Sequence, residues 1–190
     1  MLHLRNHRRF SIDEYLGLEE NSSSKSEYCQ GEIFSMSGGS LEHNRIVADV
    51  LTELNVALRG KQCQVFPSDL RLYIASKQVL TYPDIVVVCG LPQLLPGRTD
   101  TITDATLVVE VLSPSTQEYD RNGKFRIYRD LPSFSEYLLI AQDEIRVEHH
   151  RRQGPGQWLM TEHISRNAEV VLSSIEVAVS MGEIYRRIGL

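Results

Sequence analysis

Residues 107–115 read Leu-Val-Val-Glu-Val-Leu-Ser-Pro-Ser, and a second apolar run at 82–88 reads Tyr-Pro-Asp-Ile-Val-Val-Val. Each run is short enough for a buried strand and holds a single carboxylate, Glu110 in the first and Asp84 in the second. A buried, unpaired charge costs roughly several kcal/mol unless its pKa shifts or it finds a cation. The two acids therefore point to a site in which both are compensated.

The two carboxylates would share one cleft if the runs form neighbouring strands. Side chains alternate along a strand, so Asp84 shares a face with Val86, and Glu110 shares one with Val108. Carboxylates held close together raise each other's pKa, and a divalent cation between them removes that cost. Mg²⁺ is the expected ion, with Mn²⁺ as an alternative, because Mg²⁺ prefers oxygen ligands. The spacing also allows a purely structural reading, in which Asp84 caps a strand after Pro83 and Glu110 forms an ion pair.

A lysine follows the second run at a distance that suits a helix. Residues 113–115 end the strand and start a helix expected to run to about residue 130. Lys124 lies four residues after Asp120, so the two share a helix face and either form an exposed pair or bring the ammonium over the strand end. In the second case the ammonium would orient or deprotonate an attacking water and stabilise charge on a phosphate oxygen. Asn122-Gly123 interrupts this helix, because Gly costs about 1 kcal/mol relative to Ala in a helix interior.

Length and charge restrict the class of protein. The 190 residues suit one compact domain, 1–190. The 20 Lys+Arg against 25 Asp+Glu give a net charge of −5, which argues against a protein that binds polyanions through bulk positive charge. A local basic groove remains compatible with this balance. The arginines available for it are Arg45, Arg71, Arg121, Arg126, Arg129, Arg151 and Arg152.

The cysteines and the apolar runs indicate where in the cell the protein is expected. Cys29, Cys63 and Cys89 are odd in number and far apart, and their spacing does not suit a zinc site. A reducing cytoplasm is the expected compartment. No apolar run approaches the about 18 residues of a membrane span, and the N-terminal segment with Arg5 and His7 lacks the apolar core of a secretory signal.

The remaining pattern mixes helices and strands without an internal repeat. Helices are expected over 11–19, 41–60 and 180–188, besides the one that follows residue 115. Strands are expected within 27–37, 64–66, 70–74, 85–89, 106–112, 136–141, 146–150 and 158–162. This order predicts an α/β (α+β) fold with a mixed sheet.

The motifs of this chain resemble those of a known family. The resemblance rests on Tyr-Cys-Gln-Gly-Glu32-Ile, Gly-Gly-Ser-Leu-Glu-His43-Asn44, Tyr-Pro-Asp84-Ile-Val-Val-Val, Leu-Val-Val-Glu110-Val-Leu-Ser-Pro-Ser, Asp120…Lys124…Tyr128 and Glu136-Tyr137. From about residue 10 to about residue 162 the chain is similar to the Uma-type family of proposed restriction endonucleases, which has the PD-(D/E)XK nuclease-like fold. The resemblance implies a restriction-endonuclease-like mixed central sheet flanked by helices, with an N-terminal helix and β-hairpin.

The resemblance also implies roles for individual residues. Asp84 corresponds to the first motif acid, Glu110 to the second, and Lys124 to a motif lysine that has moved onto the following helix. Leu112 stands where the ordinary E-x-K motif has its lysine, so the assignment depends on that move.

Two further residues have weaker support. Glu32 would approach from the hairpin as an additional acid, or else is an exposed strand residue. His43 would contact the metal-binding residues without binding the metal itself, or else is a partly exposed residue at the start of a helix.

The predicted function is metal-dependent hydrolysis of phosphodiester bonds in nucleic acid, with DNA as the expected substrate. Asp84, Glu110 and the backbone carbonyl of Val111 would hold Mg²⁺, and Lys124 would position the nucleophile. The resemblance further implies a homodimer. Two alternatives stay open: a catalytically inactive nuclease-fold module that binds nucleic acid or protein, and a hydrolase of small phosphorylated substrates.

Overall fold

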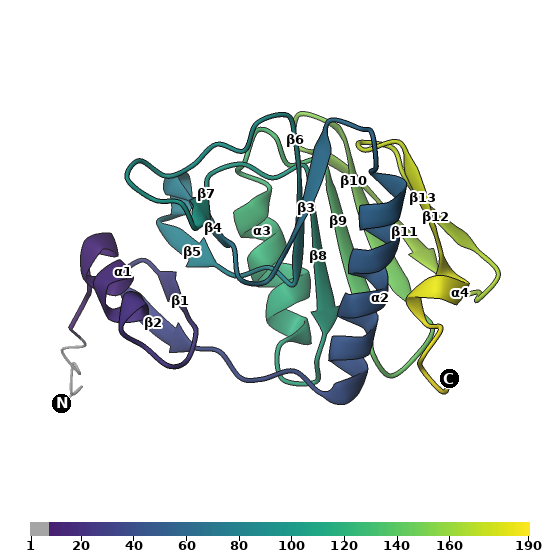
Figure 1. Ribbon diagram of the computed structural model, residues 1–190, viewed down its shortest axis with the longest axis horizontal. Coiled ribbons are helices and arrows are strands. Elements are labelled where there is room, and N and C mark those ends of the chain that lie inside the picture. Colours follow the sequence, from purple (N-terminus) through teal and green to yellow (C-terminus); the bar gives the residue numbers. More distant parts are fainter. Residues whose placement is uncertain (1–7) are drawn as a thin grey trace.

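The computed structural model describes residues 8–190, so that Arg5 and His7 lie outside the described residues (Figure 1). A six-stranded sheet with the order β11-β10-β9-β8-β6-β3 forms its centre. Its strands are β3 (Cys63–Pro67), β6 (Ile85–Cys89), β8 (Leu107–Leu112), β9 (Glu136–Ala141), β10 (Val147–Gly154) and β11 (Gln157–His163). The pair β8 and β9 is parallel, and the other pairs of this sheet are antiparallel. The predicted mixed sheet is confirmed.

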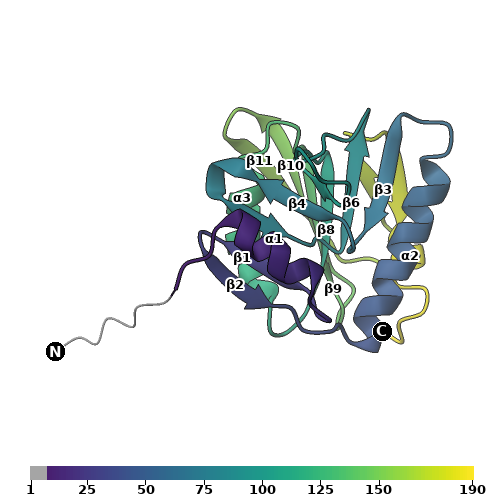
Figure 2. The same ribbon diagram turned by 60° about the vertical axis from the view of Figure 1, so that its left-hand side comes forward.

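The central strands are apolar because both faces of the sheet are covered. All six residues of β8 and all six of β9 are buried, as expected for strands packed on two sides. On one face lies α2 (Leu41–Ala57), whose Ile46, Val50 and Leu54 repeat at helical spacing and pack against the sheet. On the other face lies α3 (Phe125–Tyr128), which continues a π-helical segment, η2 (Tyr119–Lys124). Figure 2 shows α2 and α3 on opposite sides of the sheet.

A second sheet joins the N-terminal elements to the rest of the molecule. Its order is β2-β1-β5-β4-β7. Its strands are β1 (Ser26–Cys29), β2 (Glu32–Ser35), β4 (Arg71–Ile74), β5 (Val79–Thr81) and β7 (Thr101–Ile102), with the short helix η1 (Ala75–Lys77) before β5. The hairpin β1–β2 turns at Gln30 and Gly31, whose φ values of 51° and 96° fit the twist of a two-residue turn. Helix α1 (Ile12–Glu20) starts with the predicted capping box of Ser11 and Glu14.

Several elements differ from the sequence-based prediction. The short strands β5 and β7 were not predicted, nor was the hairpin of β12 (Glu169–Leu172) and β13 (Val177–Ser180). The last helix, α4 (Met181–Ile184), ends four residues earlier than expected. It ends there because the Tyr185 hydroxyl donates to the backbone oxygens of Ala141 and Arg146, at 3.0 and 2.7 Å, which holds the chain against the large sheet.

Two half-exposed arginines after α4 form ion pairs with a buried aspartate of α2. Asp49 is fully buried on α2, and its Oδ1 accepts hydrogen bonds from Arg186 Nη2 at 3.1 Å and Arg187 Nε at 3.0 Å. Burial raises the pKa of Asp49, but the two guanidinium groups outweigh it and hold that pKa below its usual value. The C-terminal segment is therefore fixed to the long helix.

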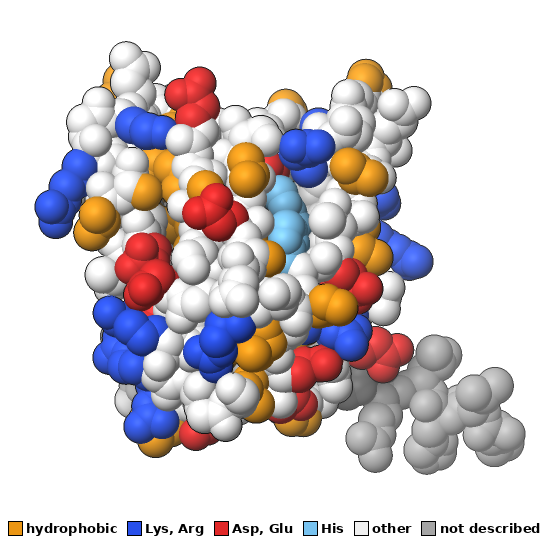
Figure 3. Space-filling view, turned by 90° about the vertical axis from the view of Figure 1, so that its right-hand side faces the viewer, with side chains coloured by type: hydrophobic (Ala, Val, Ile, Leu, Met, Phe, Trp, Pro, Cys, Tyr) orange, Lys and Arg blue, Asp and Glu red, His pale blue; other side chains and the backbone are white. Residues whose placement is uncertain are grey.

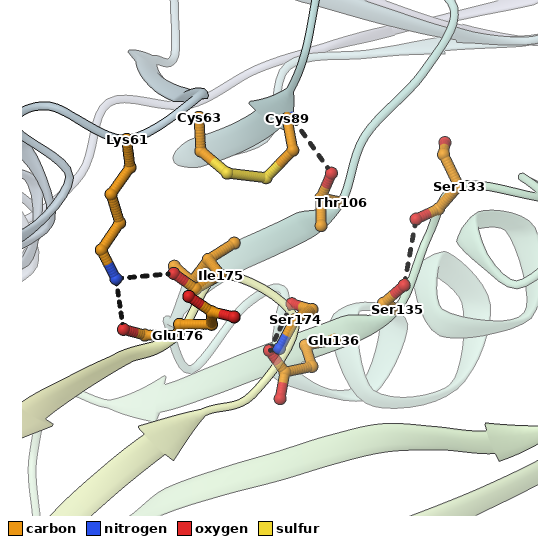
Figure 4. The surroundings of a disulfide bond; sticks show 10 residues. All are labelled: Lys61, Cys63, Cys89, Thr106, Ser133, Ser135, Glu136, Ser174, Ile175 and Glu176. Atoms are coloured by element: carbon orange, nitrogen blue, oxygen red, sulfur yellow. Dashed lines mark hydrogen bonds between the residues drawn. A yellow bond between two sulfur atoms is a disulfide. The ribbon is translucent and has the colours of Figure 1, made fainter.

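A disulfide joins Cys63 and Cys89, which face each other across β3 and β6 (Figure 4). Beside it, Lys61 Nζ donates to the backbone oxygens of Ile175 and Glu176 in the turn between β12 and β13. Disulfides are rare in cytosolic proteins, so this bond is an observation against the predicted reducing compartment, which stays a prediction.

The face with β12, β13 and α4 carries interspersed acidic and basic side chains (Figure 3). Histidine side chains form a strip near its middle, and no single charge sign dominates this face. Among the described residues, no helix has the length and apolar character needed to cross a membrane.

Candidate active site

The pairing of β6 with β8 brings the two motif carboxylates together. Ile85 lies opposite Val109 in this antiparallel pair, so the next position places Asp84 opposite Glu110. Val86 and Val108, on the faces predicted for the two acids, pack in one core cluster with α3. The predicted neighbouring strands, and the shared face of the two acids, are therefore present in the structure.

A cavity of about 460 Å³ opens at this point, and we call it the acidic cavity. Five of the six residues predicted for the site line it: Asp84, Glu110, Val111, Lys124 and His43. The loop before α2 and the Ser-Pro-Ser turn before η2 form much of the remaining wall. The starts of two helices thus point toward the same space.

Asp84 is held by two donors. Its Oδ2 accepts a hydrogen bond from the backbone N–H of Val111 at 2.8 Å and one from His43 Nε2 at 3.1 Å. Burial lowers the pKa of His43, but the hydrogen bond and charge of Asp84 outweigh it, so that this pKa lies above its usual value. His43 sits close to Gly39, where a Cβ atom would lie 2.6 Å from Nδ1 of the ring. The glycine before α2 is therefore needed for the histidine to reach Asp84.

Glu110 is nearly fully buried and paired. Its Oε1 accepts hydrogen bonds from Lys124 Nζ at 3.0 Å and from the Tyr128 hydroxyl at 2.8 Å. Burial raises the pKa of Glu110 to about 8, the negative charge of Asp84 adds to the rise, and Lys124 opposes it. The pKa of this carboxyl therefore lies well above that of an exposed glutamate.

Lys124 is surrounded by carboxylates. Besides Glu110, its Nζ lies 3.2 Å from Asp120 Oδ1 and 3.7 Å from Glu27 Oε1. Burial alone would lower the pKa of Lys124, but these negative groups outweigh it and raise it well above its usual value. The side chain is thus a permanent ammonium, which can orient a nucleophile or stabilise anionic charge but cannot act as a base. The role of Lys124 in a reaction stays a prediction.

The π-helical segment η2 explains how the lysine reaches the cavity. Both Asp120 and Lys124 are buried, on the inner side of this widened turn. A Cβ atom at position 123 would lie 2.3 Å from the Tyr119 ring, so Gly123 makes room for that ring. The interruption predicted at Asn122-Gly123 is therefore a π-helical stretch, a feature that often occurs at functional sites.

Glu32 is the one predicted side chain that does not reach the acidic cavity. It is exposed on β2, opposite Cys29 at the end of the hairpin. Its place next to Lys124 is taken by Glu27, whose Oε1 accepts hydrogen bonds from the Thr81 hydroxyl and from the backbone N–H of Tyr82. The sequence signal for Glu27 was weak because its partners come from β5, a strand of only three residues.

Each of the two motif acids has one carboxylate oxygen that is available to bind a metal ion. Asp84 Oδ1 and Glu110 Oε2 receive no hydrogen bond from the described residues, while their other oxygens are occupied. Within residues 8–190, no three His, Cys, Asp or Glu side chains come together as a complete metal-binding group. Two carboxylates with a backbone carbonyl and water suit Mg²⁺, which rarely uses an all-protein cage. The oxygen donors present therefore fit this ion.

The arginines considered for a basic groove do not gather here. None of the seven lines the acidic cavity. Arg71 is buried beside Asp100, Arg121 pairs with Glu148 at 2.8 Å, and Arg152 donates to backbone oxygens. These three arginines thus stabilise the fold.

Comparison with protein families decides the membership of the chain. The model of the Uma2 family, described as "Putative restriction endonuclease", matches residues 12–181. The chain belongs to the Uma2 family. The resemblance seen in the sequence motifs is confirmed.

Three other proteins are similar to this chain over most of its length. Protein sll1609 of Synechocystis sp. is 40% identical over 164 residues, which are 86% of this chain and 93% of that protein. Protein slr1290 of the same organism is 37% identical over 178 residues, or 94% of this chain and 92% of that protein. The crystal structure of a "putative nuclease belonging to DUF820" from Anabaena variabilis matches with a TM-score of 0.75 at 21% identity, over 93% of this chain and 98% of that one. This last match confirms the fold predicted for the Uma2 chain.

Proposed function

We propose that this protein is a metal-dependent endonuclease that hydrolyses phosphodiester bonds, with DNA as its substrate. One observation carries the proposal: Asp84, Glu110 and the permanent ammonium of Lys124 converge in one cavity, although they come from three separate elements. Structural ion pairs alone would not require a cavity around them.

The residues present divide the chemistry among them. Asp84, Glu110 and the carbonyl of Val111 would hold Mg²⁺, which when bound would activate a water molecule and neutralise charge on the scissile phosphate. Val111 and His43 fix the orientation of the Asp84 carboxylate through its Oδ2. Lys124, 3.0 Å from Glu110, would supply a positive charge that stabilises the negative charge developing on the phosphate.

The acidic cavity also supports a second candidate, a hydrolase of small phosphorylated substrates. Its volume of about 460 Å³ lies within the range of about 300–1,000 Å³ usual for small-molecule sites. None of the seven candidate arginines lines it to bind a long phosphate backbone. The catalytically inactive binding module is distinguished from both candidates by the absence of metal binding.

The test measures nicking of supercoiled plasmid, cleavage of single-stranded DNA and hydrolysis of bis(p-nitrophenyl) phosphate, each with Mg²⁺ or Mn²⁺. Asp84→Asn should abolish activity on the true substrate, whereas Asp13→Asn, an exposed acid on α1, serves as the matched control. Calorimetric titration with Mn²⁺ should show binding to the wild type and not to Asp84→Asn. Equal residual activity in both variants would contradict the site, and light scattering on the same samples tests the homodimer that we also propose.

A further inference from the structure

A second cavity, of about 280 Å³, is lined in part by Glu27, which lies 3.7 Å from Lys124 Nζ, and we call it the aromatic pocket. Its lining consists of Glu27, Tyr28, Cys29, Phe34, Val79 and Tyr119. Nearly all of this wall is apolar, and Glu27 is its charged group. The proposed hydrolysis does not use this space.

Two exposed aromatic rings distinguish the aromatic pocket from the rest of the surface. Phe34 is 51% exposed and Tyr119 is 44% exposed. Every other Phe, Tyr or Trp in residues 8–190 is buried or partly buried. Exposed rings gathered in one pocket offer flat apolar faces, which is how proteins bind unpaired nucleobases by stacking.

The two rings belong to different elements of the fold. Phe34, Glu27 and Cys29 lie on one face of the β1–β2 hairpin, because Glu27 pairs with Phe34 and side chains alternate along β1. Tyr119 lies against Gly123, which leaves no room for any larger residue at that position. The hairpin thus carries Phe34, and the π-helical segment carries Tyr119.

The aromatic pocket and the acidic cavity share no lining residue, but neighbouring positions of two elements line them. On the hairpin, Phe34 lines the pocket and Met36, two residues on, lines the acidic cavity. On the helix, Tyr119 lines the pocket while Thr116 and Asp120 line the acidic cavity. A nucleotide chain with one phosphate beside Asp84 would thus have the pocket within reach of a neighbouring base.

The single carboxylate of the pocket adds a preference among bases. Glu27 uses Oε1 for Thr81, Tyr82 and Lys124, and its Oε2 receives no hydrogen bond from the described residues. A carboxylate oxygen accepts hydrogen bonds from exocyclic amines such as N4 of cytosine. Thymine has no such amine.

We propose that the aromatic pocket binds an unpaired, amine-bearing base of single-stranded DNA next to the phosphate held in the acidic cavity. This inference rests on the proposed function, and it specifies the substrate as a strand that is unpaired at the site. Stacking on Phe34 and Tyr119 supplies the affinity for the unpaired base, and Glu27 supplies the preference for bases with an exocyclic amine.

The test measures the fluorescence anisotropy of labelled oligo-dC, oligo-dT, oligo-rC and a DNA duplex with Ca²⁺ in place of Mg²⁺. The wild type should bind oligo-dC more tightly than oligo-dT, oligo-rC or the duplex. Phe34→Ala and Tyr119→Ala should each raise the Kd for oligo-dC about 5- to 150-fold, the range that corresponds to loss of one base–aromatic stack. Tyr119→Phe should retain the affinity because it keeps the ring, and Leu91→Ala, 83% exposed elsewhere, is the control. Circular dichroism melting confirms that each variant is folded.

The outcomes separate this inference from the hydrolysis itself. Tight binding that falls in Phe34→Ala, without any cleavage by the wild type, supports the pocket and contradicts the proposed function. Cleavage by the wild type with an unchanged Kd in both alanine variants overturns the pocket alone. Equal affinity for oligo-dC and duplex, tighter binding of oligo-rC, or no binding of oligo-dC also overturns it.

Discussion

Replacing Lys124 by methionine should destabilise the protein strongly and in a pH-dependent way. The ammonium is nine-tenths buried and lies 3.0 Å from Glu110, 3.2 Å from Asp120 and 3.7 Å from Glu27. At an effective dielectric constant of about 20, each contact contributes an attraction of about 4–6 kcal/mol, much of it offset by desolvation. Removing one partner of such a buried group costs about 3–5 kcal/mol because it leaves the opposite charge uncompensated.

The pH dependence follows from Glu110. Its pKa is already raised to about 8 by burial, and loss of the neighbouring ammonium raises it further. Below that pKa the carboxyl is neutral in the folded protein, so Lys124→Met should cost less at pH 6 than at pH 9. The double variant Lys124→Met/Glu110→Gln should recover about 0.5–3 kcal/mol relative to the sum of the single variants.

Urea unfolding followed by the fluorescence of Trp158, the single tryptophan, measures these free energies. The control is Lys77→Met, because Lys77 is 40% exposed in its pair with Asp130 and its loss should cost less than about 1 kcal/mol. A cost below about 1 kcal/mol for Lys124→Met at pH 9, or strict additivity in the double variant, would refute the idea that the carboxylates depend on this ammonium.

Three further predictions concern the same region and the disulfide. In the folded protein Glu110 holds a proton that the unfolded chain releases between pH 4.5 and about 8, so the free energy of unfolding should fall by up to about 1.4 kcal/mol per pH unit as pH rises through this window. Glu110→Gln should remove that slope in urea titrations across the window, and an unchanged slope would argue against the buried carboxyl. Gly123→Ala should lower the melting temperature because the new Cβ atom meets the Tyr119 ring. In a Tyr119→Ala background the same change should stabilise the protein by up to about 1 kcal/mol, as Ala does in helices. A stabilising effect in both backgrounds would contradict the contact. Cys63→Ser should lower the free energy of unfolding by about 3 kcal/mol under oxidising conditions, given the separation of 26 residues from Cys89, and should have a smaller effect with reductant present.

The sequence was most informative where burial is two-sided. The apolar runs around Asp84 and Glu110 identified β6 and β8, and side-chain alternation correctly assigned both acids to one face. Lys124 was proposed from its place four residues after Asp120 on the helix that follows the Ser-Pro-Ser turn, and the family resemblance then identified it as the motif lysine because Leu112 occupies the usual place.

Other parts of the site depend on contacts that leave little trace in the sequence. Glu27 is positioned by β5, whose three residues are too few to show alternation, whereas Glu32, which a family pattern permits, ends at the exposed tip of the hairpin. The hairpin of β12 and β13 consists of two four-residue strands. Strands this short also show too little alternation to be recognised from the sequence. A π-helical stretch has no propensity signal of its own, and Asn122-Gly123 indicated only that the helix is irregular.

The buried pairing of Asp49 with Arg186 and Arg187 bears on the order in which the chain can complete its fold. Asp49 lies on α2 and is synthesised 137 residues before the first of these arginines. Until both arginines have been made, the Asp49 carboxylate lacks the two guanidinium groups that stabilise its charge in the folded protein. The stable packing of the long helix, and with it the placement of His43 beside Asp84, is therefore expected to depend on contacts made by Arg186 and Arg187, far along the chain from α2.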